Sequence, residues 1–268
     1  MSRAAPDPGA RALLRVAVEA ARAGGAVLRR SFGAGHAYAR KGVIDLVTST
    51  DLAAEAAILR VLRRRVPDHE VLAEESGAHA SRGGSPFRWL IDPLDGTTNF
   101  AHGYPFVCTS VAVVRAGRAV AGAVFDPLRD ELFTAARGHG ARCNGRRIRV
   151  SAVRRLREAL LVTGFPYDVH AHGRRVVREF QAFLRHAQGI RRDGSAALNL
   201  CYLACGRFDG FWELRLHPWD VAAGSLIATE AGGRVTDYGG GRYDLSGRET
   251  LASNRHLHRR MQQVLETA

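Results

Sequence analysis

The stretch Trp89-Leu90-Ile91-Asp92-Pro93-Leu94-Asp95-Gly96-Thr97-Thr98-Asn99-Phe100 combines an apolar run, two carboxylates and paired hydroxyls. The apolar residues 89–91 predict a buried strand, so Asp92 and Asp95 would leave the sheet together. The proline between them removes a backbone donor, and the carbonyl oxygen of Leu94 is available as a further hard ligand. Because Mg²⁺ prefers oxygen ligands, the stretch predicts a magnesium site at the end of a strand.

The second part of this stretch predicts a phosphate site beside the metal. Gly96 and the residues after it predict a tight turn that opens a short helix, which would leave the amides of Gly96, Thr97 and Thr98 unpaired at its N-terminus. The alternative is that Asp95 only caps this helix. An EF-hand is excluded because the alternating acids and the closing Glu are missing. A P-loop is excluded because the only lysine, Lys41, does not follow a glycine-rich turn.

Composition indicates one compact unit. The chain has 268 residues, 46% of them hydrophobic, enough for a single domain over residues 1–268 with halves at about 1–150 and 151–268. The net charge of +13 is carried almost wholly by arginine. It would suit RNA, membranes or anionic substrates. Because the arginines are scattered rather than clustered, a compositional bias of the genome is the favoured explanation.

The sequence contains no recognisable targeting or membrane segment. Residues 1–32 alternate arginines with short apolar patches and lack the apolar core of a secretory signal, and no segment is long enough to span a membrane. The cysteines are interpreted as free thiols in a reducing cytosol, which predicts a cytoplasmic protein. They are Cys108, Cys143, Cys201 and Cys205.

The N-terminal part predicts two helices and a strand ahead of the central stretch. Helical periodicity covers residues 8–31, and after an extended loop at 41–48, Ser49 or Thr50 can cap a second helix that runs to about residue 66. Asp51 lies in the first turn of that helix, where it either favours the helix dipole or faces the site as a base or water orienter. A short strand at 71–73 would then deliver Glu74, and residues 76–85 would form a polar loop.

The remaining chain predicts a meander followed by alternating strands and helices. The meander strands are 106–114, 119–125 and 131–135, with a further hairpin at 144–145. Later strands are expected at 159–163, 208–213, 234–236 and 249–253, and helices at 174–187, 195–205, 219–231 and 256–265. His256 and His258 are interpreted as solvated helix residues. Asp220 in the first turn of the third of these helices favours the helix dipole.

Taken in order, these segments resemble the inositol monophosphatase family of magnesium-dependent, lithium-sensitive phosphatases. The resemblance covers nearly the whole chain. It is carried by residues 41–51, Glu74-Glu75-Ser76, the central stretch 89–100, residues 192–198, Trp219 to Gly224 and Glu230-Ala231-Gly232-Gly233. It implies an α+β fold, a layered αβαβα sandwich with an antiparallel N-terminal sheet and a mixed C-terminal sheet, and it implies a homodimer.

The resemblance also implies the metal ligands. Glu74, Asp92 and the carbonyl of Leu94 would hold one Mg²⁺, while Asp92, Asp95 and Asp220 would hold a second. Glu74 would also help to position a third, so that two or three ions are expected per subunit. Bound metal of this kind lowers the pKa of an attacking water and stabilises the leaving alkoxide.

The remaining site residues follow from the same resemblance. Asp51 and Thr97, with Glu74 nearby, are the catalytic candidates and would orient and deprotonate the water, while the amides of Gly96 and Thr97 would stabilise the phosphate in the transition state. A carboxylate that accepts two hydroxyl hydrogen bonds suits a polyol substrate. The candidates for substrate contact are Asp95, Gly96, Thr97, Gly194, Ser195, Ala196, Glu213 and Asp220.

Three alternatives stay open. Fructose-1,6-bisphosphatase or nucleotide 3'-phosphatase activity would share the metal site and differ in the leaving-group pocket. A protein that mainly binds RNA or a transcription partner is a different class, and the lack of an aromatic-rich RNA motif weighs against it.

Asp193 departs from the family pattern, and an acid there is expected to alter substrate selectivity. His217 would either pack or contact the ligand.

Overall fold

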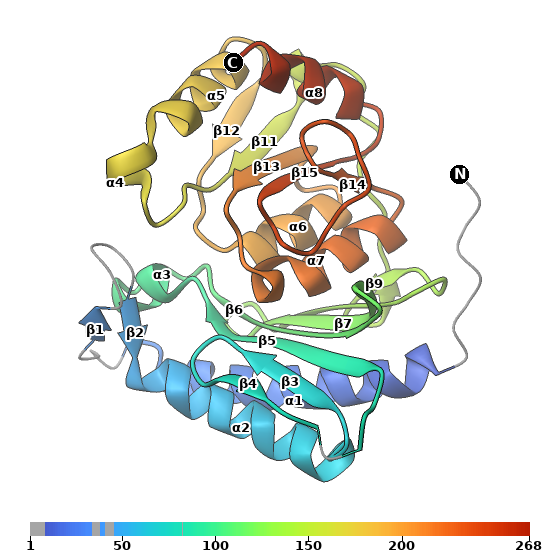
Figure 1. Cartoon of the computed structure of the whole chain (residues 1–268). Helices are drawn as coiled ribbons and strands as arrows, with labels where there is room; N and C mark the ends of the chain where they lie inside the picture. Colours follow the sequence, from blue (N-terminus) through green and yellow to red (C-terminus); the bar gives the residue numbers. More distant parts are fainter. Residues whose placement is uncertain (1–8, 34–37, 41–45, 82) are drawn as a thin grey trace.

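Five layers build the fold (Figure 1). The computed structural model describes residues 9–33, 38–40, 46–81 and 83–268. Helices α1 and α2 cover one face of an eight-stranded sheet, and α6 and α7 cover its other face. A five-stranded sheet follows, with α5 and α8 on the outside. This order confirms the predicted αβαβα sandwich. Lys41 lies outside the described residues.

The N-terminal sheet is a meander with one parallel pair. Its strands run in the spatial order β10-β9-β8-β7-β6-β5-β3-β4. Every pair is antiparallel except β3 with β5, so the expectation of a purely antiparallel sheet is corrected at that point. The strand β4, in the segment predicted as a loop, was not expected. The bounds are β3 Glu70–Ala73, β4 Gly77–His79, β5 Phe87–Asp95, β6 Cys108–Arg115, β7 Arg118–Asp126, β8 Glu131–Ala136, β9 Ala141–Cys143 and β10 Arg146–Arg147.

The first two helices bury their apolar faces on this sheet. They are α1 (Ala10–Ser31) and α2 (Ser49–Arg65), which contact each other and the strands β5, β6 and β7. The N-cap of α2 is Thr48, not Ser49 or Thr50, because Thr48 Oγ1 accepts from two amides of the first turn while Asp51 bonds back to the Thr48 amide. The short strands β1 (Tyr38–Arg40) and β2 (Leu46–Thr48) form a separate pair beside them.

The C-terminal sheet is mixed, as expected. Its order is β12-β11-β13-β15-β14, with β11 parallel to both neighbours and the other pairs antiparallel. Its strands are β11 Leu160–Thr163, β12 Gly189–Arg191, β13 Gly210–Leu214, β14 Arg234–Thr236 and β15 Glu249–Ser253. The helices of this part are α4 Val169–His172, α5 Arg174–Leu184, α6 Ala196–Ala204, α7 Pro218–Glu230 and α8 His258–Glu266, and a 3₁₀ turn covers Leu156–Glu158.

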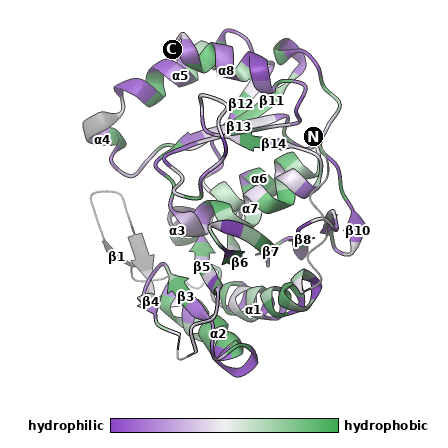
Figure 2. Cartoon of the chain, turned by 45° about the vertical axis from the view of Figure 1, so that its right-hand side comes forward, coloured by the Kyte–Doolittle hydropathy of each residue, from purple (hydrophilic) through white to green (hydrophobic). Residues whose placement is uncertain are grey.

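The middle layer carries much of the core. Helices α6 and α7 are mostly apolar and buried, and Figure 2 shows them coloured mainly white to green between the two sheets. The outer helix α8 places His258 on its buried face, with 1% of the residue exposed. The interpretation of His258 as a solvated residue is therefore wrong, whereas His256 is exposed.

No helix in the described ranges is both long enough and apolar enough to cross a membrane.

Candidate active site

A β-bulge turns both acids of the central stretch to one side of the sheet. In a regular strand, residues three apart face opposite sides. Between Asp92 and Asp95, however, the pairing of β5 with β6 shifts: Asp92 opposes Ser110 and Asp95 opposes Cys108, so three steps on β5 match two on β6. The extra residue restores a common direction. The Leu94 amide donates to Asp92 Oδ1 at 3.0 Å, which holds this irregular backbone.

Glu74 reaches the same place through the parallel pair. Because β3 and β5 run in the same direction, their carboxyl ends lie at one edge of the sheet, and the Glu74 amide donates to Ile91 O at 3.1 Å. The next turn is fixed from α2: the buried Glu55 accepts from the amides of Glu75 and Ser76 at 2.9 and 3.0 Å. Glu55 thus positions the segment that carries Glu74.

Asp220 comes from the other half of the chain. It lies in the first turn of α7, where its Oδ2 accepts from the His217 amide at 2.7 Å. The His217 ring stacks on Trp219 at 4.8 Å, so this histidine packs as well as lining the pocket. One pocket is lined by all the candidate metal ligands: Glu74, Asp92, Leu94, Asp95 and Asp220.

The acids of this pocket raise one another's pKa. Burial is the main reason that the pKa of Asp92 lies well above its ordinary value, and the charges of Glu74, Asp95 and Asp220 add to it. Burial and the neighbouring acids likewise raise the pKa of Asp220. Burial raises the pKa of Asp95 to about 6, although hydrogen bonds from Ser195 and α6 amides oppose this. Carboxylates enclosed at such density repel one another until a cation joins them.

The donor set therefore fits a hard divalent cation. It offers four carboxylates and a backbone carbonyl, all oxygen ligands of the kind that Mg²⁺ takes. Within the ranges that the structure describes, no three His, Cys, Asp or Glu side chains are already gathered as they would be around a bound ion. A side-chain hydrogen bond with Glu74 contributes to the raised pKa of Asp92, so these two acids already lie beside each other.

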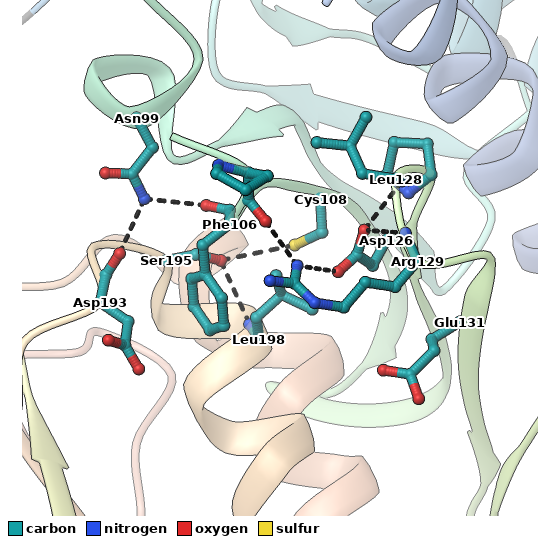
Figure 3. A network of polar contacts seen from close by, with 12 residues as sticks. Asn99, Phe106, Cys108, Asp126, Leu128, Arg129, Glu131, Asp193, Ser195 and Leu198 are labelled. Carbon is teal, nitrogen blue, oxygen red and sulfur yellow. Dashed lines mark hydrogen bonds and ion pairs between the residues drawn. The ribbon is translucent and has the colours of Figure 1, made fainter. Parts of the chain in front are cut away.

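The start of α6 fixes Asp95 from across the pocket. Ser195 Oγ donates to Asp95 Oδ2 at 2.8 Å, and the Ala197 amide donates to the same oxygen at 2.7 Å. The two halves of the chain are tied again nearby, because Asn99 Nδ2 donates to the carbonyls of Phe106 and Asp193 (Figure 3). The loop before α6 is thereby held against the central stretch.

The turn at Gly96 opens the short helix α3 (Thr97–Ala101), as predicted. Gly96 has φ +100°, and a Cβ there would lie 2.9 Å from Phe106 O, so only glycine fits. Thr97 Oγ1 lies 3.1 Å from Asp51 Oδ1 and 3.0 Å from Leu94 O. Asp51 is 1% exposed and does not line the pocket itself. It both completes the cap of α2 and reaches the pocket through Thr97, so both of its expected roles remain available.

The opposite wall holds the expected substrate residues. Gly194, Ser195, Ala196 and Glu213 all line the pocket. Burial raises the pKa of Glu213 to about 8. Its carboxyl group takes the space beside Gly164, where a Cβ would overlap Glu213 Oε1.

Some lining residues were not predicted from the sequence, and two residues expected at the site, Asp51 and Asp193, do not line the pocket. Arg215 and the segment 164–167 line the pocket although no motif signalled them, and Arg192, which begins the segment 192–198 of the family resemblance, lines it without having been given a role. Asp193 is absent from the lining, and its carboxyl faces the charges of Arg191 and Arg129 instead. The expectation that Asp193 alters selectivity therefore has no direct contact to support it.

An acidic pocket beside a helix start, between the layers of an αβαβα sandwich, defines a phosphatase of the metal-dependent class. The model of the Inositol monophosphatase family matches residues 10–268. The inositol-1-monophosphatase of Synechocystis sp. is 46% identical over 253 residues, which cover 94% of this chain and 88% of that protein. The Nus factor SuhB of Salmonella typhimurium is 44% identical over 231 residues, 85% of this chain and 86% of that protein.

Solved structures agree with the sequence relatives. The extragenic suppressor protein suhB of Bartonella henselae matches with a TM-score of 0.91 and 42% identity, covering 96% of this chain and 99% of that one. The chain therefore belongs to the inositol monophosphatase family.

Proposed function

We propose that the chain hydrolyses phosphate monoesters of small polyols with Mg²⁺, above all inositol monophosphate to inositol and phosphate. The observation that carries the proposal is the convergence of four carboxylates from three segments beside the turn at Gly96. A relative with 46% identity, named an inositol-1-monophosphatase, supports the choice of substrate.

The acids and one carbonyl would hold the metal. Glu74, Asp92 and Leu94 O would share one ion, and Asp92, Asp95 and Asp220 a second, with two or three ions per subunit. When bound, Mg²⁺ lowers the pKa of a water and neutralises charge on the phosphate and the leaving oxygen.

The attacking water would be oriented by the pair Asp51 and Thr97. The carboxyl of Asp51 holds the Thr97 hydroxyl at 3.1 Å, and Thr97 lines the pocket. Burial raises the pKa of Asp51, which suits a group that accepts a proton during the reaction. The amides of Gly96 and Thr97 would hold phosphate oxygens as charge develops.

The polyol would lie against the opposite wall. Glu213 with a pKa of about 8 is protonated at neutral pH, so it can both donate and accept a hydrogen bond. Neighbouring hydroxyls of a cyclitol need both. The loop of Gly194, Ser195 and Ala196 would complete this wall, with Asp95 and Asp220 beside it.

A substrate panel tests the proposal. Phosphate release is measured from inositol 1-phosphate, fructose 1,6-bisphosphate, histidinol phosphate and adenosine 3',5'-bisphosphate, with magnesium and with a chelator. Asp220→Asn should lose more than about 100-fold in rate, beyond the effect of removing a typical outer-shell partner. The matched control is Asp244→Asn, an exposed acid outside this pocket. Preference for another phosphate ester would reassign the leaving-group wall, and equal losses in both variants would contradict the metal site.

A second candidate is association with RNA or a transcription partner. Relatives named Nus factor SuhB favour it, and the net charge of +13 suits a polyanion. Electrostatic RNA binding should weaken steeply as salt rises, which a binding series at increasing salt concentration measures. Absent or salt-independent binding would remove this candidate.

We further propose a cytoplasmic homodimer, as expected from the family resemblance. Light scattering coupled to size-exclusion chromatography measures the mass directly. A mass of one 29.1 kDa chain at working concentration would overturn the dimer.

A further inference from the structure

A second cavity lies at the other end of α7 from the acidic pocket. Its volume of about 600 Å³ is in the range that holds small organic ligands. Asp220 lines the acidic pocket from the first turn of α7, whereas Leu226 and Thr229 line this cavity from the second half of the same helix. In the described part of the chain, no residue lines both. The cavity is therefore a separate site, which we call the arginine cavity.

Four arginines line the arginine cavity, whereas none of the described acids does. They come from the starts of β7 and β14, the end of β8 and the loop before β15: Arg118, Arg234, Arg137 and Arg242. The adjoining cavity, which shares Arg242, also has four arginines, but three acids accompany them: Asp237, Asp244 and Glu249. The arginine excess of the whole chain thus explains the cations of the arginine cavity but not its lack of acids.

The cations of the arginine cavity lack carboxylate partners. Among the residues that the structure describes, none of the four arginines forms an ion pair within 4.0 Å. Glu230, at the end of α7, is occupied because its carboxylate accepts from the amides of Gly138 and Gly140 at 2.8 and 2.7 Å. Three of the arginines are exposed, so a ligand can reach their guanidinium groups: Arg118, Arg234 and Arg242.

Arg137 is the fixed member of this set. It is half-buried, and its Nε donates to the Ala119 carbonyl at 2.8 Å while its Nη2 donates to the same oxygen. Burial lowers the pKa of Arg137; the charge of Glu230 opposes this effect, and the charge of Arg118 adds to it. Two of the cations therefore repel each other, and an anion bound beside them would relieve this repulsion.

The deeper part of the arginine cavity is apolar. Leu226 is buried, and Val235 and Leu245 pack on the core of the middle layer. The ring of Tyr243 adds to this surface, because its hydroxyl is already paired with Thr250 Oγ1 at 2.9 Å. A ligand that fills the cavity must therefore bring an apolar body as well as negative charge.

We propose that the arginine cavity binds a small organic polyphosphate, whose body lies on Leu226 and Val235 while its phosphates bind the arginines. An arginine binds phosphate through two parallel N–H donors, and its planar head also stacks on flat rings. A nucleoside triphosphate combines both features, so ATP is the probe. The site uses no residue of the acidic pocket and does not depend on the proposed phosphatase function.

Calorimetric titration with ATP in the presence of a chelator tests the site. Without metal, the acids of the other pocket repel phosphate, so the heat reports binding elsewhere. We expect ATP to bind at least about tenfold more tightly than adenosine or inorganic tripolyphosphate, because each of these lacks one half of the recognised features. Tripolyphosphate that binds as tightly as ATP would overturn the organic ligand, and no binding at about 1 mM ATP would overturn the site.

Matched variants locate the binding. Arg118→Ala combined with Arg242→Ala should weaken ATP binding at least about tenfold, and Arg234→Ala alone should weaken it independently. The control combines Arg185→Ala with Arg259→Ala, because both residues are exposed and outside the cavity. This control and Asp220→Asn should each change the affinity less than about twofold. A wild-type Tm shows that each variant is folded.

Two results would contradict the assignment of the ATP to the arginine cavity. Equal losses in the two arginine pairs would show that ATP responds to net charge alone. Lost binding in Asp220→Asn would place the ATP in the acidic pocket. Since phosphate release is not measured, a failure of the proposed phosphatase function leaves this test unaffected.

Discussion

Acidification should loosen the attachment of the C-terminal helix through His258. Its ring lies between Thr236 Oγ1 at 2.8 Å from Nε2 and Ser253 Oγ at 2.9 Å from Nδ1. The Thr236 hydroxyl donates to the Asp237 carbonyl, so the network assigns the hydrogen of the ring to Nε2 and leaves Nδ1 to accept from Ser253. The neutral ring is satisfied on both sides, and it ties the start of α8 to β14 and β15.

The magnitude follows from the pKa of the ring. Burial, helped by the charge of Arg234, lowers the pKa of His258 from 6.5 to about 4. Because folding depresses the pKa of this base, its contribution to stability is complete above pH 6.5 and is lost as pH falls toward 4. Between about pH 7.5 and about pH 5, the loss amounts to about 2 kcal/mol in the free energy of unfolding.

Urea unfolding at both pH values measures this loss, with His258→Gln and His256→Gln beside the wild type. Glutamine cannot titrate, so the stability of His258→Gln should fall about 2 kcal/mol less on acidification than that of the wild type. Titration of the carboxylates is common to all three proteins and cancels. His256 is exposed and two residues away, so its variant should follow the wild type. Parallel curves for all three proteins would refute the reasoning.

The remaining predictions concern the pocket. Thr97→Ala should lower kcat by about 100-fold with little change in KM because the water loses its orienting hydroxyl. Thr97→Ser should recover most of the lost kcat, and a change confined to KM would contradict the role of Thr97 in orienting the water. Gly96→Ala should cost about 1–3 kcal/mol in unfolding free energy, clearly more than Gly103→Ala, which shares a positive φ but has open space around it. Magnesium at about 100 times its Kd should stabilise the fold by about 2.7 kcal/mol, seen as a higher Tm that a chelator reverses; an unchanged Tm would argue against ion binding by these acids.

Local signals in the sequence predicted most of the helices and strands, whereas the layered fold followed from the family resemblance. The turns around Gly117 and Asn144-Gly145 separate the strands of the meander, and residue patterns predicted α1, α6 and α7 to within a few residues. The parallel pairing of β3 with β5 is non-local and has no signal of its own. The cap of α2 shifted to Thr48 because Thr48, Ser49 and Thr50 are all chemically able to cap, and only the backbone geometry decides among them.

The site was predictable only in part, and for a physical reason. The spacing of Asp92 and Asp95 suggested a metal, but alternation along a strand would have sent them to opposite faces, and the bulge is invisible in the sequence. Asp220 and Glu74 joined the set through the family resemblance, not through any local signal. Glu55 gave none at all, because a buried carboxylate that binds two amides looks like any helix acid until the turn above it is seen.

The misreading of His258 and the lack of any predicted role for Arg192 have the same origin. Histidine and arginine are usually solvated at the end of a helix or strand. Here the position of each side chain depends on a partner far along the chain. Thr236 and Ser253 enclose the histidine, whereas Phe165 supports the guanidinium. The same holds for the four acids of the pocket, which three separate segments deliver to one point between the layers. Their repulsion is unfavourable for the fold alone, so the arrangement is explained by the cation and phosphate that such a cluster can hold.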